Sequence, residues 1–211
     1  VGKTVAEMEL ALNLGIYCFN VESSAELEQL NEVAGRINKV APVSLRINPD
    51  VDAGTHPYIS TGLKENKFGI AMDEAEQVFA RAAQLPHLQI KGVDCHIGSQ
   101  LTEIKPFLDA MDRMLALIDR LAEQGIVIEH FDVGGGLGVD YDGSKSSYFS
   151  SVNYSIEEYA NDVIYQVKNI CDEANVPCPN IISESGRAIV AHYSVLITNI
   201  LNTNTQNALP D

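Results

Sequence analysis

The sequence predicts an α/β fold built on a parallel sheet, and two patterns lead to that prediction. Short apolar runs rich in β-branched residues alternate along the 211 residues with longer segments whose apolar residues recur every three or four positions. Strands that alternate with helices pair in parallel through right-handed crossovers. Three of the runs end in polar or glycine-rich segments, and the carboxyl ends of parallel strands share one edge of a sheet. We therefore expect one pocket at that edge.

The first half of the chain carries signals for three helices and three longer strands. Ser23 and Glu26 have the spacing of a capping box, and Asp73 with Glu76 predicts another helix start. We expect helices over residues 3–14, 23–35 and 73–85. We expect strands over residues 17–21, 43–47 and 88–95, and a short strand or turn at 67–70. The polar segment 51–66 is long, which is typical of a functional loop.

The second half continues the alternation. Thr102 with Glu103 predicts the start of a helix, and Ser155 with Glu158 forms a further capping box. We expect helices over residues 102–124 and 155–174. We expect strands over residues 126–133 and 180–183, with a polar loop at 140–154. The β-branched content of residues 188–200 predicts an extended arm, and residues 202–211 form a polar tail.

Charge and composition exclude several classes of function. The formal net charge of −15 would repel a nucleic-acid backbone, so we expect no nucleic-acid partner. No apolar run reaches the length of a membrane span, so we expect no membrane partner. The cysteines lack the spacing of a metal site, which predicts reduced, buried thiols, no bound metal and a cytoplasmic location. The four residues concerned are Cys18, Cys95, Cys171 and Cys178.

The three strand ends carry the chemistry that the sequence predicts. Gly134, Gly135 and Gly136 follow an apolar strand, and their N–H groups are suited to an anion such as phosphate. The alternative is a turn whose glycines serve steric need alone. The other two ends place His96 and Glu184 two positions before a glycine.

The motifs HIGSQ, DVGGGLG and ESGRAIV, in this order, resemble those of the fold-type III pyridoxal-phosphate decarboxylases, whose barrel is like that of alanine racemase. Residues 1–138, with CFNVES and LRINPDVDAGTHPYISTGLKENKFGI, resemble diaminopimelate decarboxylase, whereas residues 139–200 resemble biosynthetic arginine decarboxylase. The resemblance implies a parallel (β/α)8 TIM-barrel-type domain that binds pyridoxal 5'-phosphate. We expect a partial barrel over residues 1–201, lacking three strands and a C-terminal β domain, in a piece of a longer protein.

The resemblance also implies catalytic roles for His96 and Glu184. Glu184 would hold the pyridine nitrogen of the cofactor, unless it forms a salt bridge to Arg187. His96 would stack on the cofactor ring, unless it is only structural, and Arg46 would support it or pair with a strand-end acid. The remaining implied cofactor contacts are Ser99, Gly134, Gly135, Gly136, Ser185, Gly186 and Arg187. Ser185 stands where many relatives have proline, and Arg187 is also expected to contact substrate.

The lysine that would form a Schiff base has no counterpart here. In the family it lies in a YAxKAN-like motif, and no lysine of this sequence matches it; the lysines compared are Lys3, Lys67, Lys91 and Lys105. We therefore expect a decarboxylase portion whose substrate is a small-molecule amino acid and which is inactive alone, within a homo-oligomer or with a complementing chain segment. The substrate stays open between diaminopimelate, arginine and another amino acid. A non-catalytic phosphate-ligand-binding module and a recombined or engineered fragment stay open too.

Overall fold

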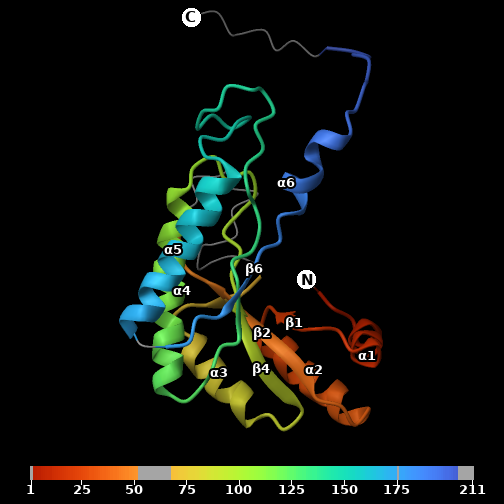
Figure 1. Ribbon diagram of the computed structural model, residues 1–211. Coiled ribbons are helices and arrows are strands. Elements are labelled where there is room, and N and C mark those ends of the chain that lie inside the picture. The colour runs from red at the N-terminus through yellow and green to blue at the C-terminus, as the bar shows by residue number, and fades with distance from the viewer. Residues whose placement is uncertain (1, 52–67, 175, 204–211) are drawn as a thin grey trace, which may run out of the picture.

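The computed structural model describes residues 2–51, 68–174 and 176–203 and shows one parallel sheet (Figure 1). Its strands follow the order β1-β2-β4-β5-β6, with β3 paired to β2, and every described pair is parallel. The strands are β1 Phe19–Val21, β2 Ala41–Asn48, β3 Ile70–Ala71, β4 Leu88–Asp94, β5 His130–Asp132 and β6 Asn180–Ile182. The predicted parallel α/β fold is confirmed.

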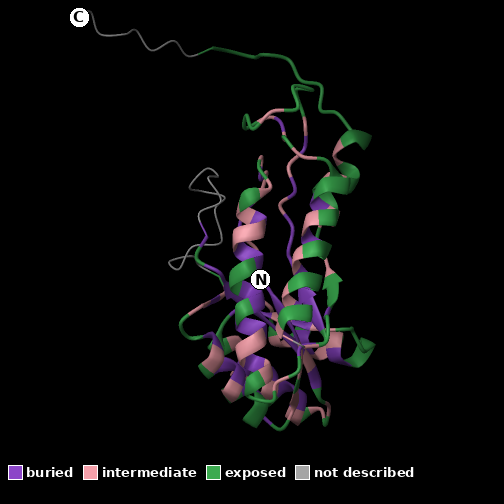
Figure 2. Cartoon of the chain, turned by 60° about the vertical axis from the view of Figure 1, so that its left-hand side comes forward, coloured by how far each residue is buried: buried purple, intermediate pink, exposed green. Residues whose placement is uncertain are grey.

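Helices border the sheet in chain order, from α2 at the lower right of Figure 1 to α5 at the upper left. They are α1 Val5–Leu14, α2 Ser24–Arg36, α3 Ala75–Gln84, α4 Lys105–Glu123, α5 Ile156–Ala174 and the short α6 Gly186–Val190, which runs into a 3-10 turn at Ala191–Tyr193. Buried residues concentrate in the sheet and on the helix faces turned toward it (Figure 2). No helix in the described ranges is both long enough and apolar enough to cross a membrane.

The two faces of the sheet differ in polarity because successive side chains of a strand point to opposite faces. One face is apolar and packs into the core with the helices; its members include Val21, Leu45, Val93 and Phe131, all fully buried. The other face carries polar side chains at alternate positions. Those that are buried are Glu22, Ser44, Arg46, Asn48, Asp94, His130 and Asp132. The open, inner side of the partial barrel is therefore polar.

Local capping explains several helix starts. Thr4 forms a capping box with Glu7 at α1, and Ser23 Oγ accepts a hydrogen bond of 3.1 Å from the Glu26 N–H at α2. Ser155 and Glu158 form the predicted capping box, with bonds of 2.7 and 3.1 Å. In each case a side-chain hydroxyl accepts a hydrogen bond from a first-turn N–H that would otherwise have no partner. The helix therefore begins directly after that residue.

Two predicted helix starts are wrong by two or three residues. α3 begins at Ala75 after Glu74, without a side-chain cap, so Asp73 is not its N-cap. α4 begins at Lys105 rather than near Thr102. Its second residue is Pro106, which the first turn of a helix tolerates because its N–H would have no partner there.

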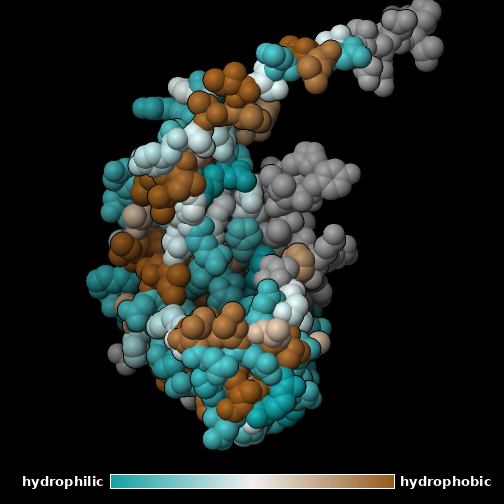
Figure 3. Space-filling model, turned by 90° about the vertical axis from the view of Figure 1, so that its right-hand side faces the viewer, coloured by the Kyte–Doolittle hydropathy of each residue, from teal (hydrophilic) through white to brown (hydrophobic). Residues whose placement is uncertain are grey.

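The predicted extended arm over residues 188–200 is wrong in its first part, because residues 186–193 are helical. No regular element follows between these residues and residue 203. The side chains of Val195, Leu196 and Ile197 are 90, 91 and 90% exposed. Figure 3 shows hydrophobic side chains along this segment. β-branched residues form a strand only where a neighbouring strand supplies hydrogen bonds and packing. The sheet ends at β6, and no described strand lies beside this segment.

Two smaller expectations changed, and a third is not tested. β5 is shorter than the predicted strand over residues 126–133. Cys95 and Cys171 are buried as expected, but Cys18 is only partly buried and Cys178 is exposed. The long loop expected at 51–66 lies outside the described residues except for Val51, and most of the polar tail also lies outside them.

Candidate functional site

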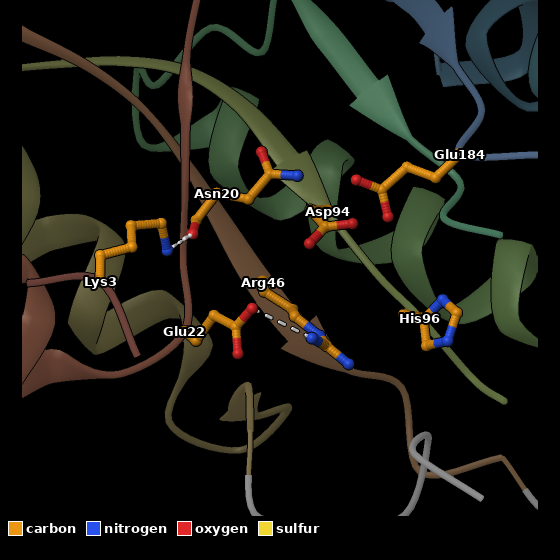
Figure 4. Close-up of a pocket in the computed structure, with 7 residues that line it drawn as sticks. All are labelled: Lys3, Asn20, Glu22, Arg46, Asp94, His96 and Glu184. Carbon is orange, nitrogen blue, oxygen red and sulfur yellow. Dashed lines mark hydrogen bonds and ion pairs between the residues drawn. The ribbon is translucent and has the colours of Figure 1, made fainter. Parts of the chain in front are cut away.

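A cavity of about 300 Å³ opens on the polar face, at the carboxyl ends of the strands. Strands β1, β2 and β4, together with the residues just after β1 and β4, contribute most of its lining, and Glu184 reaches it from the segment after β6 (Figure 4). The lining residues are Lys3, Asn20, Glu22, Arg46, Asp94, His96 and Glu184. The structure thus brings together His96 and Glu184, which lie 88 positions apart in the sequence.

The glycine turn joins the other two strand ends to the cavity. The Gly135 N–H donates to His96 Nδ1 at 3.3 Å, and the Glu184 N–H donates to the Gly134 carbonyl at 2.8 Å. A Cβ atom on Gly135 would lie 2.5 Å from the Glu184 carbonyl oxygen. The backbones approach too closely for any side chain at this position, so the steric account of the glycines is supported.

The N–H groups of the three glycines are not equivalent. Gly134 donates to Asp132 Oδ1 at 2.9 Å, and Gly135 donates to His96. Gly136 has φ +88°, a left-handed conformation that favours glycine, and its N–H has no acceptor among the described residues. Of the three expected phosphate donors, only Gly136 therefore has an uncommitted N–H.

His96 is partly buried, and its surroundings favour the neutral ring. Burial is the main cause that lowers its pKa, and the positive charge of Arg46 lowers it further. The bond from Gly135 makes Nδ1 an acceptor, which places the ring proton on Nε2. A neutral ring in a fixed orientation can stack on a flat ligand without adding charge.

Arg46 forms a buried ion pair with Glu22. Nη1 of the arginine lies 3.2 Å from Oε1 of the glutamate, and each side chain is 9% exposed. The strand-end acid is thus the partner of Arg46. The sequence analysis did not identify Glu22. Its position directly after β1 makes it an acid at a strand end, which was the available signal.

Lys3 lines the cavity but is held by the chain itself. Its Nζ donates to the Asn20 carbonyl and to Glu26 Oε1, each at 2.6 Å. The Lys3 amine is therefore engaged by a backbone carbonyl and by an ion pair within the chain. This geometry agrees with the expectation that Lys3 is not the lysine of a Schiff base.

Carboxyl groups outnumber cations around the cavity. Asp132 accepts from the Gly134 N–H at 2.9 Å and from Asn20 Nδ2 at 3.2 Å, and burial raises its pKa. Burial, and then the charge of Asp132, raise the pKa of Glu184 as well, whereas Arg46 opposes this shift. Such a field favours a ligand group that binds a proton, such as a pyridine nitrogen.

Several predicted contacts lie beside the cavity rather than in its lining. Ser99 and Ser185 are partly buried, and Gly186 and Arg187 are exposed on α6. Among the described residues Arg187 forms no ion pair, so the alternative salt bridge to Glu184 is absent. Glu184 is left to face the cavity (Figure 4).

Gln100 and Tyr154 are supporting residues that the sequence analysis missed. Gln100 accepts from the Val139 N–H at 3.1 Å and donates to the Val139 carbonyl at 2.8 Å. The Tyr154 hydroxyl accepts from the Gly138 N–H at 3.0 Å and donates to the Leu101 carbonyl at 2.9 Å. These bonds tie the loop after β4 to the loop after β5. The final residue of the HIGSQ motif was the available signal for the first of them.

Comparison with known proteins identifies relatives of the chain. The sequence is 54% identical over 200 residues to the diaminopimelate decarboxylase of Pseudomonas aeruginosa, covering 95% of this chain and 45% of that protein. It is 50% identical over 192 residues to the biosynthetic arginine decarboxylase of Geobacter sp. strain M21, covering 90% of this chain and 30% of that protein. The chain therefore spans less than half the length of these relatives.

The fold of the chain also matches that of a solved relative. The crystal structure of diaminopimelate decarboxylase from Helicobacter pylori complexed with L-lysine superposes with a TM-score of 0.78 at 39% identity, covering 90% of this chain and 44% of that one. The sequence model described as "Pyridoxal-dependent decarboxylase, pyridoxal binding domain" matches residues 1–191. The chain belongs to this family of pyridoxal-dependent decarboxylases, as part of their cofactor-binding barrel.

Proposed function

We propose that the chain is the cofactor-binding portion, residues 1–201, of a decarboxylase that acts on diaminopimelate in lysine biosynthesis. The observation that carries the proposal is the meeting of Glu184 and His96 at one cavity, beside a glycine turn that is hydrogen-bonded to both. The family membership and the 54% identity to a diaminopimelate decarboxylase support it. The arginine decarboxylase relatives, at 50% identity, favour arginine as the second candidate substrate.

The residues present fit pyridoxal 5'-phosphate. The excess of carboxyl groups suits a protonated pyridine nitrogen, and the Gly136 N–H is available to an anion. When bound, pyridoxal phosphate supplies an electron sink for the carbanion that is left when carbon dioxide departs. In this proposal Glu184 holds the proton on the pyridine nitrogen, and His96 covers one face of the ring.

The other contacts are proposed for the phosphate and the substrate. Gly136 would donate its N–H to the phosphate, supported by Ser99, Ser185 and Gly186. Gly134 and Gly135 would shape this part of the site rather than donate, because their N–H groups are already bound. Arg187 would contribute its charge to the phosphate or to a substrate carboxylate. Its exposure on α6 supports a role in binding an anion from solvent.

We also propose that this part of the protein needs a further segment for activity. Lys3, the lysine that lines the cavity within the described ranges, is engaged by Asn20 and Glu26. A lysine from another segment or chain would supply the Schiff base. A homo-oligomer, or assembly with a complementing segment, is supported by the sheet edges at β1 and β6.

Calorimetry on the 211-residue chain tests cofactor binding. Pyridoxal phosphate should bind more tightly than pyridoxal, because the phosphate contacts are lost in the second ligand. Glu184→Gln should weaken binding, whereas Lys3→Gln should not abolish it. Equal binding of the two ligands would contradict the phosphate site. Carbon dioxide release from diaminopimelate and arginine, with a complementing segment added, would then separate the two substrates.

A further inference from the structure

The polar face of the sheet holds four carboxyl groups close to a single buried arginine. Glu22 pairs with that arginine, Arg46, at 3.2 Å. Asp132 accepts two hydrogen bonds, from Gly134 and Asn20, and Glu184 is largely exposed to solvent. Each of these three carboxylates thus has a partner or water to stabilise its negative charge.

Asp94 has neither kind of stabilisation. Asp94 is 3% exposed, and its Oδ1 is buried without a hydrogen-bond partner. Among the described residues no hydrogen bond to its side chain occurs. In the sheet register it lies opposite Arg46 on β2 and opposite Asp132 on β5. It also lines the cavity and is directed toward the Glu184 carboxyl (Figure 4).

An ionised carboxylate in such a place is costly. Burying a charge without hydrogen bonds is strongly unfavourable, and neighbouring like charges add to the cost. When several acids share too few cations, the proton goes to the acid that is least stabilised as an anion. By that criterion the proton goes to Asp94, which lacks both the donors of Asp132 and the exposure of Glu184.

We propose that Asp94 is a neutral carboxylic acid at neutral pH and acts as a positioning residue that keeps the negative charge of the cavity on Glu184. The part that concerns Glu184 rests on the proposed cofactor function. The protonation of Asp94 itself does not.

The electrostatic surroundings agree with this assignment. The groups that face Asp94 are Glu22 from directly after β1, Arg46 from β2, Asp132 from β5 and Glu184 from beyond β6. Burial raises the pKa of Asp94 well above its usual range, and Asp132 raises it further against the opposing effect of Arg46. An ionised Asp94 would add repulsion at Glu184 and favour protonation of that glutamate. A protonated Glu184 could not stabilise a charged pyridine nitrogen.

The first test compares the wild-type chain with Asp94→Asn, an uncharged side chain of the same shape. An acid whose pKa is higher in the folded state than in the unfolded state destabilises the fold as pH rises from the unfolded toward the folded value. The unfolded value is about 3.9, so wild-type stability relative to D94N should decline from about pH 4 upward. Urea unfolding of both chains from about pH 4 to about pH 8 measures this. Parallel profiles would overturn the proposal.

Infrared spectroscopy gives a second reading that needs no unfolding. The wild-type chain should show a protonated-carboxyl C=O band at neutral pH, and D94N should lack it. The same spectrum in both proteins would contradict a neutral Asp94, even if D94N proved poorly folded in denaturant.

The matched control is Asp132→Asn, on the neighbouring strand. Asp132 accepts from both Gly134 and Asn20, and an amide replaces one acceptor oxygen with a donor. D132N should therefore weaken binding of pyridoxal phosphate, by about tenfold for each 1.4 kcal/mol lost. D94N should weaken it less, because the amide keeps an uncharged side chain of the same shape beside Glu184. Equal losses in the two variants would refute the positioning role. If the wild-type chain binds no cofactor, the proposed function fails, but the unfolding and infrared tests of Asp94 still stand.

Discussion

Replacing Arg46 with methionine tests the electrostatics of the cavity most directly. Arg46 and Glu22 are each 9% exposed, so the pair is shielded from water and little screened by salt. Breaking a buried pair by removing one partner costs about 3–5 kcal/mol, because the other charge is left uncompensated. A typical domain has only about 5–15 kcal/mol of total stability. Arg46→Met should therefore be among the most destabilising single substitutions in the chain.

The loss should depend on pH in a defined direction. Arg46 opposes the rise in the pKa of Glu184, so its removal raises the folded-state pKa of that acid further. The folded state then binds a proton there more tightly, and the destabilisation should be largest at neutral pH and diminish as pH falls through that pKa.

Urea unfolding of the wild type and R46M at about pH 5 and about pH 8 measures both effects. The double variant R46M/E22L is the control, because replacing both members of a buried pair with apolar residues is often neutral. The double variant should regain much of the lost stability. A loss below about 1 kcal/mol, as is usual for surface pairs, or an equal loss at both pH values, would refute the reasoning.

Three further predictions follow from local geometry. Gly135→Ala should destabilise the fold by about 1–3 kcal/mol, because its Cβ would lie 2.5 Å from the Glu184 carbonyl; Gly186→Ala, where nothing lies within 4 Å, is the control in thermal unfolding. Ser155→Ala should cost about 1 kcal/mol by removing the cap of α5, measured by urea unfolding, and an unchanged midpoint would argue against the capping box. The exposed apolar segment around Leu196 and the open sheet edges should cause self-association in sedimentation velocity; a monomer at high concentration would contradict this.

Local sequence determined the order of elements and the place of the site. Ser23 and Ser155 cap their helices as their spacing predicts, since a cap depends on residues three positions apart. The apolar alternation placed the strands, and parallel strands bring their carboxyl ends to one edge. His96 and Glu184 therefore meet at the predicted cavity.

Only the tertiary structure decided which polar groups pair across that cavity. The Glu22–Arg46 pair, the unpartnered Asp94 and the commitment of the Gly134 and Gly135 N–H groups all depend on strand register and backbone approach. A shift of one residue in register would turn each side chain to the other face, and no local pattern encodes that choice between polar partners. The residues after 186 show the same dependence: their β-branched composition suited a strand, but with no described strand beside them the chain formed a short helix instead.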